Sequence, residues 1–303
     1  MNKFSKLAWF NLVWTILVIL WGAVVRATNS GAGCGNYWPL CGQSLIPTFD
    51  VFHTYVEFTH RVMSGILLIT IFIMFMIGRK RFKNDPLRRR LNFLVFCFLI
   101  VEALLGAGLV VFELVEDNDS IFRIIAISLH LLNTFILVGL TSLNAFFVSN
   151  SKIKITHLTL KGAFKFILLF ILVIGVSGAV TSLADTVYPP KSFTDTMTEW
   201  VDPQAHLLQR LRPYHPLIAG LLGLGILGYI NQFSQLKSDW GKKLRKWIHV
   251  FIFIQFGLGS LNIVLHAPLT VQILHLLFAD LIWITAIYLA FTDNEENITA
   301  YEK

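Results

Sequence analysis

Residues 57–81 read EFTHRVMSGILLITIFIMFMIGRKR, and this stretch decides the fold. It belongs to an apolar run over residues 55–78, which is long enough to cross a hydrocarbon core of about 30 Å as a helix. The run ends in the basic group Arg79-Lys80-Arg81, as spans do at a cytoplasmic surface. The stretch therefore predicts a transmembrane helix that carries an ionisable residue, His60, inside the membrane.

Seven further apolar runs of similar length lie along the chain. The 303 residues are 55% hydrophobic and 14% charged, with a mean hydropathy of +0.66, which excludes a soluble domain. The runs occupy residues 8–26, 89–112, 122–148, 163–184, 213–230, 247–265 and 270–292. We expect the first run to be a retained helix, because no small-residue cleavage pattern follows it. The sequence thus predicts an all-α membrane protein with eight transmembrane helices.

Basic residues indicate how these helices are oriented. They concentrate at residues 79–90, 152–165 and 237–246 and near both ends of the chain, whereas residues 113–119 and 185–202 are acidic or nearly neutral. Cytoplasmic loops carry the excess of Lys and Arg, so both termini are expected on the cytoplasmic side of a cell membrane. The net charge of +7 then reflects topology and contact with anionic lipid. No soluble domain presents these residues to nucleic acid.

An internal repeat divides the chain into residues 1–150 and 151–303. The match is carried by His60 with Gly65, by His215 with Gly220, and by the Leu-His-Leu-Leu segments around His130 and His275. Each half contains four predicted spans, so the two halves have the same orientation in the membrane. We therefore expect two pseudo-symmetric four-helix bundles.

Four of the histidines lie inside predicted spans, two in each half. A single such histidine is most often a hydrogen-bond partner for a neighbouring helix. Four at similar depth, repeated between the halves, instead favour haem, because two histidines on different helices can bind one iron from opposite faces. His60 with His130 and His215 with His275 are the predicted ligand pairs. Zinc is less favoured, since neither half offers a nearby intramembrane cysteine or carboxylate pair to complete a tetrahedral site.

The residue three positions before the first histidine differs between the halves. It is Glu57 before His60 and Arg212 before His215. A carboxylate beside a haem can move protons or stabilise a developing cation, so Glu57 is the candidate catalytic residue. An arginine suits a haem propionate, so Arg212 is a candidate propionate contact. The difference predicts one catalytic haem and one that carries electrons, although either side chain could instead be a solvated helix end.

Other polar residues support narrower predictions. Cys34 and Cys41 in the first outer loop, GAGCGNYWPLCG, are expected to form a disulfide, with a structural and a redox role equally open. His206, in a later outer loop, could replace His215 as an iron ligand. Glu102 and Asp280 are intramembrane acids to which the sequence assigns no function.

These residues together resemble the heme A synthase family, membrane enzymes that convert heme O to heme A for terminal oxidases. The resemblance covers essentially the whole chain. It rests on Gly22-Ala-Val-Val-Arg26, the Cys34 and Cys41 loop, Glu57-Phe-Thr-His60-Arg61, and the segments around His130 and His275. It implies that Glu57, His60 and His130 hold the substrate heme O in the N-terminal half, and that His215 and His275 hold a haem b cofactor in the C-terminal half.

The resemblance also implies a reaction and a partner. The reaction is the stepwise oxidation of a ring methyl group to a formyl group, with an outer-loop disulfide that bears on activity or haem handling. Heme O synthase, the farnesyltransferase that makes the substrate, is the implied partner, and a homo-oligomer is a further candidate. The main alternative is a dihaem b-type electron-transfer subunit. A transporter with histidine proton relays and a thiol oxidoreductase are weaker alternatives.

Overall fold

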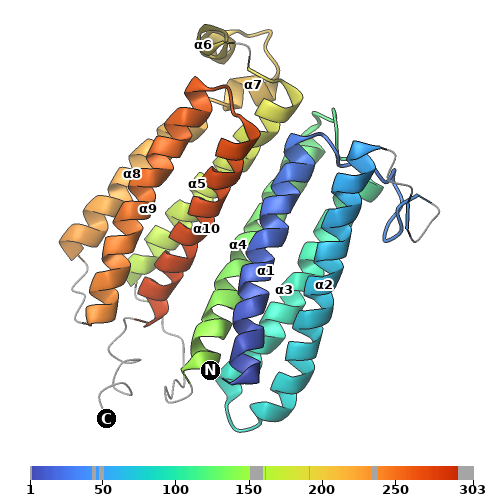
Figure 1. Ribbon diagram of the computed structural model, residues 1–303. Coiled ribbons are helices and arrows are strands. Elements are labelled where there is room, and N and C mark those ends of the chain that lie inside the picture. The colour runs from blue at the N-terminus through green and yellow to red at the C-terminus, as the bar shows by residue number, and fades with distance from the viewer. Residues whose placement is uncertain are drawn as a thin grey trace.

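The computed structural model of the chain describes residues 2–42, 46–47, 51–150, 160, 162–190, 192–233 and 238–292. All regular elements within these residues are helices (Figure 1). Among them are eight candidate spans, long and apolar enough to cross a membrane. The predicted class, an all-α multi-pass membrane protein, is therefore confirmed.

The spans lie close to the predicted apolar runs. They are α1 (Lys3–Ala27), α2 (Phe52–Arg81), α3 (Pro86–Val111), α4 (Ile121–Ser149), α5 (Gly162–Val187), α7 (Leu207–Leu211) with α8 (Tyr214–Phe233), α9 (Asp239–Val264) and α10 (Leu269–Thr292). The short helix α6 (Phe193–Val201) and α7 lie where the sequence led us to expect a loop or the edge of a span. Hydropathy does not detect helices this short.

Capping residues explain why helices begin outside the apolar runs. The Ser238 side chain accepts a hydrogen bond of 2.9 Å from the backbone N–H of Gly241, so α9 starts well before the predicted residue 247. Asp85 caps α3 in the same way, with Pro86 in the first turn. Polar caps thus extend the helices into stretches whose charged residues lower the hydropathy.

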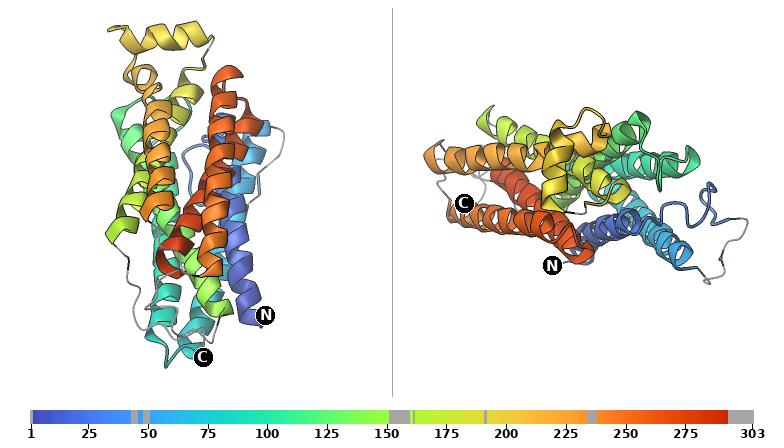
Figure 2. Two further views of the ribbon diagram at one scale, coloured as in Figure 1. Left: turned by 90° about the vertical axis from the view of Figure 1, so that its left-hand side faces the viewer. Right: turned by 90° about the horizontal axis from the view of Figure 1, so that it is seen from above.

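The spans stand side by side in two layers (Figure 2). One layer contains α9, α10, α1 and α2 in that order, and the other contains α8, α5, α4 and α3, with each helix packed on its neighbours. Contacts across the layers join α1 to α4 and α2 to α3, and likewise α5 to α10 and α8 to α9. The helices α1–α4 therefore form one group, and α5 with α8–α10 forms a second.

The two groups meet through α1, α4, α5 and α10. In the part of this interface remote from the Cys34–Cys41 loop, the indole N–H of Trp283 on α10 donates a 2.6 Å hydrogen bond to the Phe135 carbonyl on α4. The Tyr288 hydroxyl donates to the Ser142 carbonyl at 3.2 Å. Residues 133–148 of α4 and 280–290 of α10 are largely buried here. This contact closes the interface at one end of the molecule.

The other end, which carries the Cys34–Cys41 disulfide, α6 and α7, is called the disulfide end below (Figure 1). There Arg26 on α1 donates hydrogen bonds of 2.7 Å to both the Ser182 carbonyl and the Thr186 hydroxyl on α5, and one of 3.0 Å to Gln272 on α10. One half-buried guanidinium thus contacts both α5 and α10 across the boundary between the two groups. The basic stretch 79–90 lies at the opposite end, whereas Lys303 and most of residues 152–165 lie outside the described residues.

Candidate functional site

The four predicted ligands lie at similar depth, within the first ten residues of helices that begin at the disulfide end. His60 on α2 lies against Gly22 of α1, and His130 on α4 lies against Gly106 of α3, within one helix group. The rings of His215 on α8 and His275 on α10 face each other, with centroids 6.3 Å apart and planes perpendicular. The structure therefore brings His215 and His275 together and places His60 and His130 in the same helix group.

A glycine on an adjacent helix lies against each of these rings. A methyl group placed on the glycine would meet the ring Cε1 atom at 3.2 Å for Gly22 and His60, 3.7 Å for Gly106 and His130, 3.0 Å for Gly178 and His215, and 3.3 Å for Gly259 and His275. Three of these distances are shorter than ordinary van der Waals contact. The rings therefore occupy their positions because the neighbouring residue has no side chain, and the same relation occurs in both helix groups.

The ring nitrogens are poorly satisfied by the protein itself. Within the described residues, the buried Nδ1 atoms of His60, His130 and His275 have no hydrogen-bond partner. The Nδ1 atom of His215 lies 3.0 Å from the Ser177 hydroxyl, and the Gln255 amide lies 3.2 Å from Nε2 of His275. Buried polar groups normally have partners, so these unpaired Nδ1 atoms are unusual in an apolar span. A metal bound at Nε2 of His275 would displace the Gln255 amide.

The pairs suit haem iron better than a bare metal ion. Two imidazoles that bind one metal have centres roughly 6 Å apart, because each metal–nitrogen bond is about 2 Å long. The 6.3 Å between His215 and His275 agrees with this separation. No group of three or more His, Cys, Asp or Glu side chains that could hold a metal ion occurs in the described part of the chain. A haem needs only two protein ligands, since its macrocycle supplies the rest.

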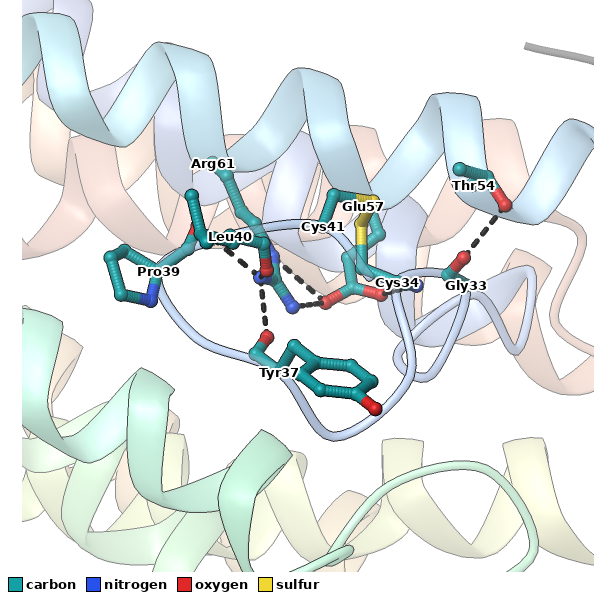
Figure 3. Close-up of a disulfide and its surroundings, with 9 residues drawn as sticks. All are labelled: Gly33, Cys34, Tyr37, Pro39, Leu40, Cys41, Thr54, Glu57 and Arg61. Atoms are coloured by element: carbon teal, nitrogen blue, oxygen red, sulfur yellow. Dashed lines mark hydrogen bonds and ion pairs between the residues drawn. A yellow bond between two sulfur atoms is a disulfide. The ribbon is translucent and has the colours of Figure 1, made fainter. Parts of the chain in front are cut away.

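Glu57 lies one helical turn from His60, beneath the disulfide loop (Figure 3). The predicted Cys34–Cys41 disulfide is present, and the backbone N–H of Cys34 donates a 2.7 Å hydrogen bond to Oε2 of Glu57. Arg61 binds the other carboxylate oxygen and also donates to the backbone carbonyls of Tyr37, at 2.7 Å, and Leu40, at 2.5 Å. Glu57 is only 3% exposed, so it is not a solvated helix end.

Arg212 occupies the corresponding place in the second group and is also buried. Its guanidinium forms ion pairs with Asp185 at 2.9 Å and Glu199 at 3.1 Å, and it donates to the Ala184 carbonyl at 3.1 Å. A further bond goes to the Tyr188 carbonyl. Arg212, which caps the end of α7, thus joins this helix to α5 and α6, and the contact with a haem propionate stays a prediction.

His206 has its contacts with residues other than the second histidine pair. Its Nδ1 atom accepts a 3.3 Å hydrogen bond from the backbone N–H of Leu208 at the start of α7, and its Nε2 atom lies 3.5 Å from a carboxylate oxygen of Asp119. The Tyr188 hydroxyl donates to the same carboxylate at 2.6 Å, which lowers the pKa of Asp119 and raises the pKa of Tyr188 to about 12. These bonds link the outer segments of the two helix groups and leave His215 as the ligand candidate.

Glu102 is a site residue to which the sequence assigned no function. Its Oε1 atom lies 3.5 Å from Nδ1 of His130. A sequence signal exists, because Glu102 precedes Gly106 by four residues just as Gln255 precedes Gly259, and both glycines lie against ligand histidines. Asp280, the other intramembrane acid, is buried, and its Oδ2 atom has no hydrogen-bond partner within the described residues.

Comparisons with known proteins agree with these features. A family model for COX15-CtaA, described as cytochrome oxidase assembly protein, matches residues 5–287. The chain is 28% identical to the heme A synthase of Bacillus cereus strain AH187 over 318 residues, which covers 100% of this chain and 97% of that protein. The same identity and coverage hold for the heme A synthase of Bacillus cereus strain Q1.

A second group of relatives carries a different name. The chain is 37% identical over 294 residues to a protein of Thermus thermophilus named protoheme IX farnesyltransferase, which covers 95% of this chain and 48% of that protein. The chain therefore spans about half the length of the Thermus relatives that it matches. Because the family model matches nearly the whole chain, the protein belongs to the COX15-CtaA family of cytochrome oxidase assembly proteins.

Proposed function

We propose that this protein is a heme A synthase, which oxidises a ring methyl group of heme O stepwise to a formyl group to give heme A for terminal oxidases. The observation that carries the proposal is a histidine pair in each helix group, the first of which has the buried carboxylate of Glu57 one turn before His60. The full-length similarity to heme A synthases of Bacillus cereus supports the same activity.

In this proposal the first pair, His60 and His130, holds the substrate heme O, and the second pair, His215 and His275, holds a haem b cofactor. Haem iron supplies the one-electron and oxygen chemistry that attack on a methyl group needs and that amino-acid side chains lack. The protein contributes ligands and glycines that admit the imidazole rings. It also contributes a span region apolar enough for a farnesylated substrate that arrives through the lipid.

Glu57 is the proposed catalytic acid or base. Cys34 and Arg61 hold its two carboxylate oxygens, so the group is fixed at one position beside the first histidine pair and is shielded from water. A fixed carboxylate can accept or return a proton at the edge of the substrate site. The second pair has Arg212 at this position, which suits a propionate contact and an electron-carrying role.

We further propose that residues 1–150 and 151–303 form two pseudo-symmetric four-helix bundles with both termini in the cytoplasm, in a cell membrane. The contacts within each helix group and the basic stretch 79–90 opposite the disulfide end support this arrangement. Heme O synthase is the proposed partner. Its support is that a Thermus thermophilus protein named for farnesyl transfer contains a segment similar to this chain.

The test is to purify the protein from cells that also make heme O, extract its haems, and identify them by chromatography and mass spectrometry. We expect heme A together with a hydroxylated intermediate, and loss of both products in His60→Ala and His130→Ala. The matched control is His249→Ala, because His249 on α9 binds the Arg245 carbonyl and Asn231 rather than another ring. Haem b alone would establish the dihaem electron-transfer subunit instead, and a colourless protein would overturn both.

A further inference from the structure

Glu102 on α3 is held beside His130 by side chains of α4. The Asn133 amide donates a 2.7 Å hydrogen bond to Oε2 of Glu102, and the Thr134 hydroxyl donates to Oε1. The same Thr134 hydroxyl lies 2.9 Å from the His130 carbonyl, so the clamp belongs to the helical turn that carries the histidine. The carboxylate therefore has a fixed position relative to the His130 ring.

The Nδ1 atom of His130 faces this carboxylate but is not yet bonded to it. The distance of 3.5 Å from Oε1 is longer than a normal hydrogen bond, and the buried Nδ1 atom has no hydrogen-bond partner within the described residues. The side chains of His130 and Glu102 are 30% and 18% exposed, so most of the surface of both is enclosed by the protein. The Oε1 atom of Glu102 is therefore placed to accept a hydrogen bond from an N–H group at Nδ1 of His130.

The second helix group has a neutral residue at the equivalent place. Gln255 on α9 lies four residues before Gly259, as Glu102 lies four residues before Gly106, and its amide contacts the His275 ring at 3.2 Å. The two groups therefore repeat the spacing of glycine and polar side chain, but the atoms contacted differ: Gln255 lies beside Nε2 of His275, whereas Glu102 lies beside Nδ1 of His130. They differ in charge, with a carboxylate beside His130 and an amide beside His275.

We propose that Glu102 is a positioning residue that accepts a hydrogen bond from Nδ1 of His130 and strengthens this histidine as an iron ligand, whereas Nδ1 of His275 has no such acceptor within the described residues. The inference rests on the proposed function, in which His130 binds iron. When a neutral imidazole binds a metal through Nε2, its proton must be on Nδ1, and this proton then points to the nearest acceptor. A carboxylate acceptor fixes the ring orientation and raises the basicity of the ligand.

A more basic ligand stabilises ferric over ferrous iron. The haem on the first pair should therefore have a lower midpoint potential than it would have with an amide at position 102. This is a difference between the two sites that the chain itself creates, because the histidines and the adjacent glycines are alike in both. It favours oxidation at the first pair and leaves the second pair a carrier of electrons.

The experiment is a redox titration, followed by absorption and electron paramagnetic resonance, of the full chain loaded with both haems. We expect Glu102→Gln to shift one of the two haems at least tenfold toward the ferrous form, about 59 mV for one electron, while the other haem is unmoved. Glu102→Asp keeps the charge but withdraws it from Nδ1, so it should also raise the potential of the first haem.

Glu113→Gln is the control for simple loss of negative charge, because Glu113 is exposed near the end of α3, and it should change neither potential. Unmoved potentials in Glu102→Gln with both haems bound would overturn the inference. A shift in Glu102→Gln but not in Glu102→Asp would also overturn it, since charge alone would then explain the effect. Protein that shows the expected shifts but makes no heme A would retain the inference and refute the proposed function. Protein that binds no haem would refute both.

Discussion

The backbone N–H of Cys34 donates a hydrogen bond of 2.7 Å to Oε2 of Glu57, so the disulfide loop itself holds the candidate catalytic carboxylate. Arg61 also holds this loop, because its guanidinium binds both Glu57 and the backbone carbonyls of residues 37 and 40. Disulfide, loop and carboxylate therefore form one structural unit beside His60. A substitution in one part should therefore alter the position of the other parts.

Removal of the disulfide should weaken this unit. We expect the double variant Cys34→Ser and Cys41→Ser to lose about 2 kcal/mol of stability, because the bond closes a short loop. The yield of heme A should fall as well, since Glu57 loses a fixed partner. Thermal unfolding in detergent and haem extraction measure the two effects. Cys97→Ser, at the unpaired cysteine on α3, is the control; a double variant that matches it would show that the loop holds its shape without the bond.

Glu57→Gln tests the carboxylate directly. A neutral amide keeps the size of the side chain but cannot exchange a proton, so we expect the heme A yield to fall at least tenfold while both haems stay bound. Haem extraction measures the product, and thermal unfolding of the same preparation detects any damage from leaving Arg61 without its counter-ion. Glu113→Gln, at an exposed carboxylate, should behave like the unchanged protein. Unaltered heme A in Glu57→Gln would remove Glu57 from the mechanism.

Gly178→Ala should weaken haem binding by the second pair. The added methyl group would stand 3.0 Å from Cε1 of His215, so this ring must shift to make room. Gly220→Ala is the matched control, because nothing lies within 4 Å of a methyl group there. Alanine is the better helix former by about 1 kcal/mol, so lower haem content in Gly178→Ala cannot be attributed to helix propensity. Equal haem content in the two variants would contradict the proposed crowding of His215.

The hydrogen bond from Tyr188 to Asp119 should make stability depend on pH at alkaline values. The pKa of Tyr188 is raised to about 12, so its contribution is complete below the ordinary tyrosine value of about 10 and is lost as the pH rises through about 12. The pKa of Asp119 is lowered, so its contribution to stability has the opposite pH dependence. That contribution is lost only as the pH falls below the ordinary carboxyl range.

Thermal unfolding measured across the alkaline range tests this bond. Tyr188→Phe should abolish the loss of stability between about pH 10 and 12. Tyr37→Phe should retain that loss, because Tyr37 is exposed and it is its backbone carbonyl that binds Arg61. An alkaline profile that is the same in Tyr188→Phe and in the unchanged protein would mean that the bond contributes nothing to stability.

The spans and their histidines could be predicted because hydrophobicity is a local property. Eight apolar runs long enough to cross a membrane are visible without any knowledge of packing, and a histidine inside such a run is conspicuous because it is costly there. The start of α9 and the short helices α6 and α7 could not be predicted from hydrophobicity. They depend on single capping residues such as Ser238 and His206, which hydropathy does not register.

The sequence by itself determined the class of fold, the four histidines and the cysteine pair, since each depends on residue type and spacing. Only the tertiary structure decided which polar groups meet. Glu57 pairs with Arg61 and the Cys34 amide, Arg212 binds two carboxylates, and Glu102 lies beside His130 although 28 residues separate them in the sequence. Such partners are set by the rotation and packing of whole helices, which many weak contacts determine together and which no short stretch of sequence encodes.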